Sequence, residues 1–234
     1  MTRERLMKAC GVAATLLALT APPLFAQEPS VEKAGGYLSA FGGAVWTGGN
    51  STGNAIFEGG VRIAPHMMIF GNIGHFADLQ PDLQPSLDAA ATALSSAGLG
   101  VTGGGTLPAW YGLAGVRAEL PASKRAWPYV LGGLGAARLN PTQEFMFTSG
   151  TMPDGSMPDV GSDVTAALTS DGSLAAPQSS TALMLTFGGG VELPVVKRWV
   201  ADVGYRYSRI AADSSLSADP LNTNAMTFGF GYRF

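Results

Sequence analysis

Eight segments of about ten residues, separated by clusters of Gly, Pro, Asn, Asp and Ser, most constrain what this chain of 234 residues can fold into. Each segment is rich in small, aromatic and β-branched residues, a composition typical of β-strands between turns. The predicted strands cover residues 36–46, 54–64, 67–76, 110–120, 127–138, 181–193, 199–210 and 224–234. Each is close to the roughly 9 to 11 residues that a tilted strand needs to cross the hydrocarbon core of a bilayer.

Several of these segments alternate between bulky apolar residues and small or charged ones. In segment 181–193, one face carries Leu183, Leu185, Phe187, Val191 and Leu193, and the other carries Thr186, Gly188, Gly190 and Glu192. Segments 54–64 and 199–210 alternate in the same way. The phase of segments 36–46, 67–76 and 127–138 stays open, because glycine and apolar residues occupy both of their faces.

The glycines share a face with the charged residues, and this decides which face we expect to point inward. A charged face that also carries the smallest residues fits inside a narrow closed tube, while the bulky apolar face then points to lipid. The alternative is a soluble barrel or sandwich, in which the apolar face is inside. Charged residues make up 13% of the chain, about half the roughly 25% of a soluble domain, which favours the membrane. No internal stretch of about 18 apolar residues is available for a membrane helix, so strands must cross the bilayer.

The connections between the predicted strands are short at one end and mostly long at the other. The short turns are residues 64–66, 121–125 and 194–198, and the other end has residues 47–53, 77–109, 139–180 and 211–223. Short periplasmic turns and longer outer loops are the pattern of bacterial outer-membrane barrels. The sequence therefore predicts an all-β fold, an eight-stranded antiparallel up-and-down transmembrane β-barrel with both termini on the periplasmic side.

The first 26 residues have the three regions of a secretory signal peptide. Arg3, Arg5 and Lys8 precede the apolar run "GVAATLLALTAPPLF", and Ala26 precedes the polar "QEPSVEK". We therefore expect a signal peptide at 1–26, a short periplasmic segment at 27–35 and the barrel at 36–234. Cys10 would leave with the signal, so the mature protein would have no disulfide, catalytic thiol or cysteine metal site.

All four tryptophans lie at ends of predicted strands. Trp127 and Trp199 are at the short-turn end, and Trp46 and Trp110 are at the long-loop end. An apolar ring with a polar N–H favours the interface between lipid and water. The placement predicts two aromatic girdles made of these four residues.

The chain ends in "FGFGYRF", in which Phe228, Phe230, Tyr232 and Phe234 share one face. With the signal sequence, the eight strands and the long loops, this ending resembles the small outer-membrane β-barrels of the OmpA/OmpX type over residues 36–234. The resemblance implies that the barrel-assembly machinery reads the four terminal aromatic residues, with Tyr232 and Phe234 as its recognition residues. Phe230 departs from the family signal, which often has glycine there. The resemblance also implies contact with outer-membrane lipid and lipopolysaccharide, and no periplasmic peptidoglycan-binding domain.

The inward face of the predicted barrel carries a balanced set of charges. Four acids and four bases are expected there, namely Glu58, Arg62, Arg117, Glu119, Glu192, Asp202, Arg206 and Arg233. An eight-stranded barrel is only wide enough for side chains to fill it. We expect an ion-pair network that closes the lumen, each charge offsetting the burial of another. The alternative is a narrow ion path through the same residues.

The two longest loops carry acidic residues and no Lys or Arg, which argues against direct binding of heparin, nucleic acid or anionic sugar. Within them, Ser86 is expected to cap a short helix with Leu87, Ala91 and Leu94 on one side. "GVTGGGT", residues 100–106, has no following lysine and is expected to be a flexible loop.

An enzyme that modifies lipid A is the less favoured alternative. It would need a nucleophile beside a base, for which His75 with Ser208 is the conceivable pair. The His-x-Ser-Asn pattern that we associate with barrel-type lipid A deacylases is absent. We therefore predict a non-enzymatic outer-membrane protein with a structural or surface-interaction role, without cofactor or metal, whose surface partner the sequence leaves open.

Overall fold

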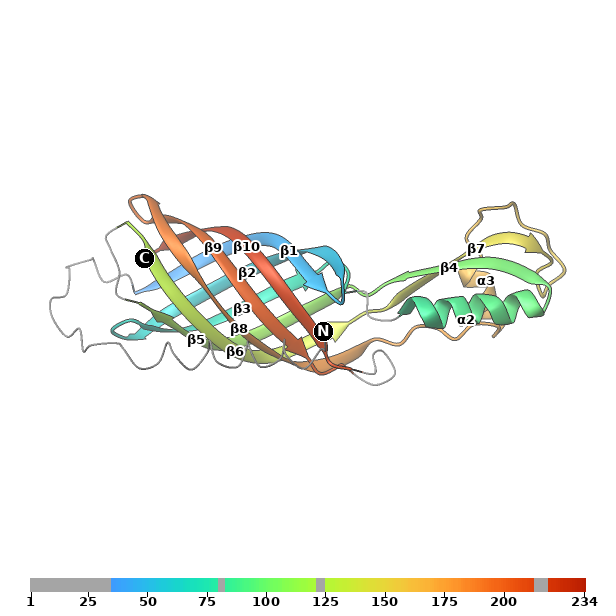
Figure 1. Cartoon of the computed structure of the whole chain (residues 1–234), viewed down its shortest axis with the longest axis horizontal. Coiled ribbons are helices and arrows are strands. Elements are labelled where there is room, and N and C mark those ends of the chain that lie inside the picture. The colour runs from blue at the N-terminus through green and yellow to red at the C-terminus, as the bar shows by residue number, and fades with distance from the viewer. Residues whose placement is uncertain (1–34, 80–82, 121–124, 213–218) are drawn as a thin grey trace, which may run out of the picture. The chain divides into compact units, whose positions relative to one another are not determined.

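The computed structural model describes residues 35–79, 83–120, 125–212 and 219–234. Eight antiparallel strands form a closed barrel of tilted strands (Figure 1). They are β1 (Gly36–Thr47), β2 (Asn50–Ala64), β3 (Met67–Phe76), β5 (Ala109–Glu119), β6 (Trp127–Leu139), β8 (Ser180–Val196), β9 (Trp199–Ile210) and β10 (Leu221–Arg233). The predicted eight-stranded antiparallel barrel is confirmed. The signal peptide and the segment 27–34 lie outside the described residues.

The barrel closes between its first and last strands. β1 pairs antiparallel with β10 from Tyr37 opposite Arg233 to Trp46 opposite Asn224. Backbone hydrogen bonds of 3.0 Å between Gly36 and Phe234 extend the pairing to the end of the chain. The N–H and C=O groups of both terminal strands are thus satisfied, as a barrel wall in hydrocarbon requires.

The strand boundaries follow the turn-forming residues, with two differences at the loop end. β1 and β2 are joined by Gly48 and Gly49, whose φ angles are 57° and 97°. Both residues have the positive φ of a tight hairpin turn, which glycine adopts without strain. The expected loop at 47–53 is therefore a two-residue turn, and β2 begins at Asn50. β10 begins at Leu221, three residues before the predicted start at 224.

Side chains alternate between the two faces of the wall, and the bulky apolar face points outward. Phe57, Phe187, Phe228 and Phe230 are 54–66% exposed, while Glu58 and Glu192 are fully buried inside. The phases predicted for segments 54–64, 181–193 and 199–210 are confirmed. The structure also fixes the open phases: β1 points Tyr37 and Phe41 inward, β3 points Phe70 and Phe76 inward, and β6 points Tyr129 and Leu131 inward.

The two longest loops contain a small folded unit, here called the lobe. It consists of residues 83–106 and 142–174. Its elements are α2 (Leu83–Ser96), β4 (Leu99–Thr106), β7 (Thr142–Gly150) and α3 (Thr165–Ser170). β4 and β7 pair antiparallel, although one precedes β5 and the other follows β6. The lobe has its own apolar core, made of Leu87, Leu94, Leu99, Phe145, Phe147, Met152, Val164, Leu168 and Leu174.

Two loop expectations are wrong for this reason. Residues 100–106 belong to a strand and not to a flexible loop, because Phe145 and Leu87 pack against them and β7 pairs with them. The helix in the first long loop exists, with Leu87 and Leu94 buried, but it begins at Leu83 and Ser86 lies within its first turn. No helix in the described ranges is long and apolar enough to cross a membrane.

Candidate functional site

The barrel lumen gathers buried charged side chains from five strands. Glu58 comes from β2, Arg117 from β5, Glu192 from β8, Arg206 from β9 and Arg233 from β10, and each is at most 7% exposed. All of them point inward because they occupy alternate positions of the wall, in phase with its glycines. Burial of single charges in this space would cost several kcal/mol each, so their pairing decides whether the fold is stable.

Glu58 is the acceptor at the centre of the lumen. Its carboxylate lies 2.8 Å from Arg206 Nη1 and 3.9 Å from Arg117 Nη1. The Tyr37 hydroxyl donates to it at 2.9 Å and Asn72 Nδ2 at 3.2 Å. Two cations and two neutral donors thus offset the burial of one carboxylate.

A second group of ion pairs lies toward the short-turn end of the barrel. Arg117 also pairs with Glu192, and Arg233 Nε donates to Glu192 at 2.7 Å. Arg233 pairs with Glu119 as well, and Arg62 Nη2 donates to Glu119 at 2.8 Å. Seven of the eight predicted residues therefore form one continuous chain of pairs, in the order Arg62, Glu119, Arg233, Glu192, Arg117, Glu58, Arg206.

Asp202 is the eighth residue, and it is held differently. It is buried, and the Tyr129 hydroxyl donates to it at 2.8 Å. Among the described residues it forms no salt bridge, so it joins the network through a neutral donor. The Arg117 guanidinium lies 3.6 Å from the Tyr129 ring centroid, which connects Asp202 to the paired residues by a cation–π contact.

Aromatic rings between the charges complete this part of the lumen, and sequence reasoning missed them. Arg117 also lies over Tyr37, at 4.8 Å, and Arg206 over Phe41, at 5.0 Å. Tyr37 and Phe41 come from β1 and Tyr129 from β6, two of the three strands whose phase was open because both of their faces are apolar. A pairing register would have found them, but alternation of polarity could not.

The lumen toward the loop end is apolar, which the sequence expectation of a polar interior did not include. Phe76 and Tyr111 stack with ring centroids 4.7 Å apart, and Ile56 and Leu113 are buried beside them. Gly74 makes room for this stack, because a Cβ there would lie 2.3 Å from the Tyr111 ring. The lumen is therefore filled by two layers, one charged and one apolar.

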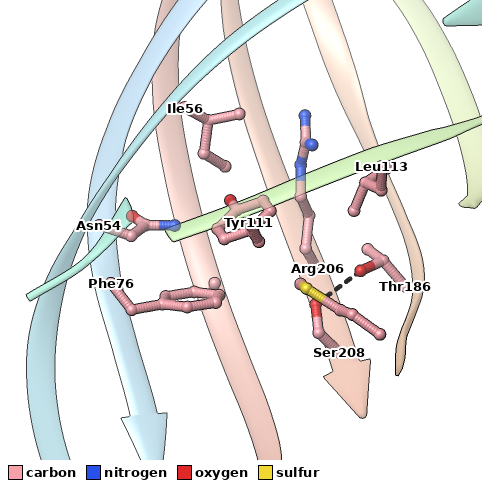
Figure 2. Close-up of a pocket in the computed structure, with 10 residues that line it drawn as sticks. Asn54, Ile56, Phe76, Tyr111, Leu113, Thr186, Arg206 and Ser208 are labelled. Carbon is pink, nitrogen blue, oxygen red and sulfur yellow. Dashed lines mark hydrogen bonds between the residues drawn. The ribbon is translucent and has the colours of Figure 1, made fainter. Parts of the chain in front are cut away.

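A small cavity lies in the lumen where Arg206 approaches the apolar layer (Figure 2). Its lining includes Asn54, Phe76, Tyr111 and Arg206, and it has room for about one water molecule. The Thr186 and Ser208 hydroxyls form a hydrogen bond of 2.9 Å at its edge. The space does not fit an organic substrate, since a ligand pocket is typically about 300 Å³ or more.

Three of the four tryptophans lie on the outer face, and one does not. Trp46, Trp110 and Trp199 are 41–59% exposed at strand ends. Trp127 shares the inward phase of Tyr129, and Arg233 lies 4.8 Å from its ring centroid. The girdle expectation is wrong for Trp127, because this ring covers a buried arginine at the short-turn end of the lumen.

The terminal aromatic residues are on the outer face of β10. Phe228, Phe230 and Phe234 are 49–66% exposed. Tyr232 is half-buried and its ring packs edge-on against Trp199, with centroids 5.3 Å apart. The four residues form one outward row that ends beside a girdle tryptophan.

The pair considered for enzymatic chemistry is not assembled. His75 is on the outer face of β3, where its ring lies 4.6 Å from the Trp110 ring. Ser208 is buried in the lumen and bonded to Thr186. The barrel wall separates the two side chains, so His75 cannot act as a base for Ser208 in this structure. No group of His, Asp or Glu residues in the described ranges has the geometry of a metal site.

Comparison with known proteins agrees with this architecture. The model of the outer membrane protein β-barrel domain family matches residues 11–234. No curated protein sequence matches the chain significantly.

Three solved barrels illustrate the structural similarity. Neisserial surface protein A is 15% identical, with a TM-score of 0.52, over 86% of this chain and 97% of its own. The attachment invasion locus protein Ail of Yersinia pestis is 14% identical, with a TM-score of 0.45, over 86% and 99%. The N-terminal barrel of OprF from Pseudomonas aeruginosa is 10% identical, with a TM-score of 0.43, over 85% and 97%.

Proposed function

Because this chain belongs to the outer membrane protein β-barrel domain family, we propose that it is a non-enzymatic membrane anchor that presents the folded lobe to a partner outside the cell. The observation that carries the proposal is the pairing of β4 with β7, which joins two long loops around a separate apolar core. A barrel without a surface role does not need a separate apolar core in the loops that connect its strands. Loops that are folded in this way suit recognition.

The filled lumen supports an anchoring role over a pore. Seven charged residues from five strands are paired across the interior, and the apolar layer adds Phe76, Tyr111 and other buried side chains. An ion would have to break buried ion pairs and then cross an apolar layer. Both steps are costly in a space that excludes bulk water.

The charge of the lobe supports a cationic partner. Residues 83–106 and 142–174 contain six acids and no Lys or Arg. The acids are Asp88, Glu144, Asp154, Asp159, Asp163 and Asp171. Met157 and Val160, in the segment after β7, are 75% and 76% exposed among these acids. An acidic surface with exposed apolar side chains complements a basic protein with an apolar patch.

The remaining steps of the proposal concern export and insertion. Residues 1–26 would direct the chain to the periplasm, and the barrel-assembly machinery would then insert it by reading Phe228, Phe230, Tyr232 and Phe234. The outward row that these four residues form supports this reading. The row also continues the lipid-facing surface of the wall.

Planar-bilayer recording of the purified protein tests the closed anchor. We expect no steady single-channel current from the wild type. A steady conductance that the substitution Arg117→Ala changes would instead establish the narrow pore, since Arg117 lies at the centre of the paired charges.

Removal of the lobe tests its surface role. A variant in which short Gly-Ser turns replace residues 80–107 and 141–179 should still form a barrel that shifts on a gel when boiled. A second variant, Asp154→Asn/Asp159→Asn/Asp171→Asn, keeps the lobe and removes three exposed charges. With polylysine as the probe, both variants should bind more weakly than the wild type. Equal binding by all three proteins would refute the acidic lobe as a contact surface.

A further inference from the structure

The outer face of the barrel has an unequal charge distribution that the proposed function does not use. The eight barrel strands contain ten charged side chains, and eight of these point into the lumen. The other two, Arg138 on β6 and Arg209 on β9, are exposed on the outer face. Both are arginines, and each is the next-to-last residue of its strand at the loop end.

Arg138 lies at the level of the girdle. It is directly opposite Trp110 in the pairing of β5 with β6, and the Trp110 ring in turn lies against the tilted ring of His75 on β3. On its other side it is opposite Thr181 of β8. Its Nε donates to Asn140 Oδ1 at a long 3.4 Å. A tryptophan on the outer face marks the interface where lipid head groups lie, so the neighbouring guanidinium is at head-group depth.

Arg209 has similar surroundings on the other side of β8. It is opposite Asn222 of β10 and Leu185 of β8. Tyr207, on the same face, donates its hydroxyl to Asn222 at 2.7 Å, and Tyr205 donates to Asn224 at 2.5 Å. Asn224 is opposite Trp46 in the pairing of β1 with β10. Arg209 is thus the cation in a row of polar and aromatic side chains at the outer interface.

The two arginines are close enough to bind one extended head group. They are opposite Thr181 and Leu185 of β8, four residues apart, on the strands to either side of it. At about 3.3 Å per residue and 4.8 Å per strand, their Cα atoms are about 16 Å apart. Two long side chains on the same face can place their guanidinium groups closer together than that.

Neither guanidinium forms a salt bridge with another residue in the part of the chain that the structure describes. A lipid-facing arginine contributes nothing to burial of apolar surface and costs up to about 1 kcal/mol near an interface, and more at greater depth. It becomes favourable when an anion in the head-group layer pairs with it. Arg forms bidentate hydrogen bonds with phosphate, which a planar guanidinium matches.

We propose that Arg138 and Arg209 form a site for the phosphate groups of lipopolysaccharide in the outer leaflet, with Trp110 and Tyr207 contacting the adjoining sugar and acyl regions. The loop end of the barrel faces the outer leaflet, because the short turns, the start of β1 and the end of β10 are at the opposite end. This site is on the barrel wall and does not depend on the lobe or on its partner.

Titration of the purified, delipidated full-length protein in detergent with lipopolysaccharide tests the site. Trp110 beside Arg138 supplies a fluorescence readout. Each substitution, Arg138→Gln or Arg209→Gln, should weaken binding roughly fivefold, and the pair about twenty-five-fold, at the typical contribution of a basic residue near an anionic surface. Arg138→Lys/Arg209→Lys should bind more tightly than the double glutamine variant but more weakly than the wild type, since the positive charges remain and the bidentate geometry is lost. Higher salt should weaken wild-type binding.

Lys197→Asn is the matched control. It also removes one positive charge, but in the short turn between β8 and β9 at the other end of the barrel. Lys197 has a φ of 49°, which asparagine tolerates better than most residues. This variant should bind lipopolysaccharide as the wild type does. Every variant is first checked for the gel shift on boiling, so that loss of binding is not loss of fold.

Three outcomes would overturn the proposal. The first is a double glutamine variant that binds within about twofold of the wild type, below the contribution of one basic residue. The second is equal wild-type affinity for intact lipopolysaccharide and for lipopolysaccharide from which phosphatase has removed the phosphates. The third is an equal loss of binding to phosphatidylglycerol vesicles, because the arginines would then contact any anionic lipid.

Discussion

Replacement of Glu192 by glutamine tests how the paired charges stabilise the barrel. Glu192 is fully buried and accepts hydrogen bonds from Arg117 and from Arg233 Nε. Glutamine has nearly the same shape but no charge, so Arg233 keeps only Glu119 and Arg117 keeps only Glu58 at 3.9 Å. Removing one partner of a buried pair typically costs about 3–5 kcal/mol, because the other charge stays buried. We expect a loss of stability in this range.

Urea unfolding of the refolded protein in lipid vesicles, followed by tryptophan fluorescence and by the gel shift on boiling, measures the change. The control is Arg62→Gln, in which Arg62 pairs with Glu119 but has a side chain 24% exposed. A partly exposed pair contributes about 1 kcal/mol or less. The double variant Arg117→Met/Glu192→Leu should recover part of the stability lost in Glu192→Gln, since it buries no unpaired charge at these two positions.

The reasoning would be refuted if Glu192→Gln unfolded at the same urea concentration as Arg62→Gln. The buried charges would then be compensated by neighbours other than the observed pairs. A double variant less stable than Glu192→Gln would also contradict the reasoning, but in the opposite sense, because the Arg117–Glu192 pair would then contribute a net attraction that apolar packing does not replace.

Four further changes have directions that the structure sets. Gly115→Ala should lower barrel stability by about 1–3 kcal/mol in the same urea assay, because its Cβ would lie 2.1 Å from a backbone oxygen of β6. Phe145→Ala should unfold the lobe and allow proteolysis within residues 152–163, while the barrel keeps its gel shift, because Phe145 is fully buried in the lobe core. Phe234→Ala should reduce the amount of protein in the outer-membrane fraction but not refolding in detergent, if the assembly machinery reads this residue. The hydroxyl and backbone N–H of Thr165 donate to Asp163 and hold the pKa of this carboxyl below its ordinary 3.8. The ionised carboxylate therefore stabilises the start of α3 above pH 3.8, and this stabilisation is lost as the pH falls through the lowered pKa. Hydrogen exchange in α3 should therefore show less protection at about pH 2.5 than at about pH 5.

The sequence was most informative where a strand carries charge on one face. Glu58, Glu192 and Asp202 each alternate with bulky apolar neighbours, so the period of two and its phase can be read directly. The boundaries of these strands were predicted less evenly: β9 has the predicted bounds, while β2 begins four residues earlier than predicted and β8 ends three residues later. The inward placement of eight charged residues follows from this alternation and from the presence of glycine on the same face.

The same reasoning could not place the rings that lie between the charges. Tyr37 and Tyr129 come from strands in which apolar residues and glycine occupy both faces, so polarity gives no phase. Trp127 was misplaced for a related reason, since a strand-end tryptophan can face either lipid or the lumen. Only the folded barrel, in which Arg233 of β10 lies over the Trp127 ring of β6, decides between the two.

The lobe was beyond sequence reasoning because its pairing is non-local. β4 reads "LGVTGGGT", with four glycines, and has little strand propensity of its own. It becomes a strand because β7, about forty residues later, pairs with it and α2 covers it. The amphipathic pattern of α2 is local, and for this reason a helix was predictable where the strand was not.

The formal net charge of -3 conceals three regions with different requirements. The lumen is balanced, with four acids and four bases, because an unpaired charge there would remain buried. The outer face of the wall carries only Arg138 and Arg209, at the depth where an anionic head group can pair with them. The lobe carries six acids and no base, because in water such charges cost little and can select a partner. If one charged surface did both tasks, each set of substitutions would weaken both lipopolysaccharide binding and polylysine binding. Because the two surfaces lie on separate elements, we expect Arg138→Gln/Arg209→Gln to affect only the first and the three lobe substitutions to affect only the second.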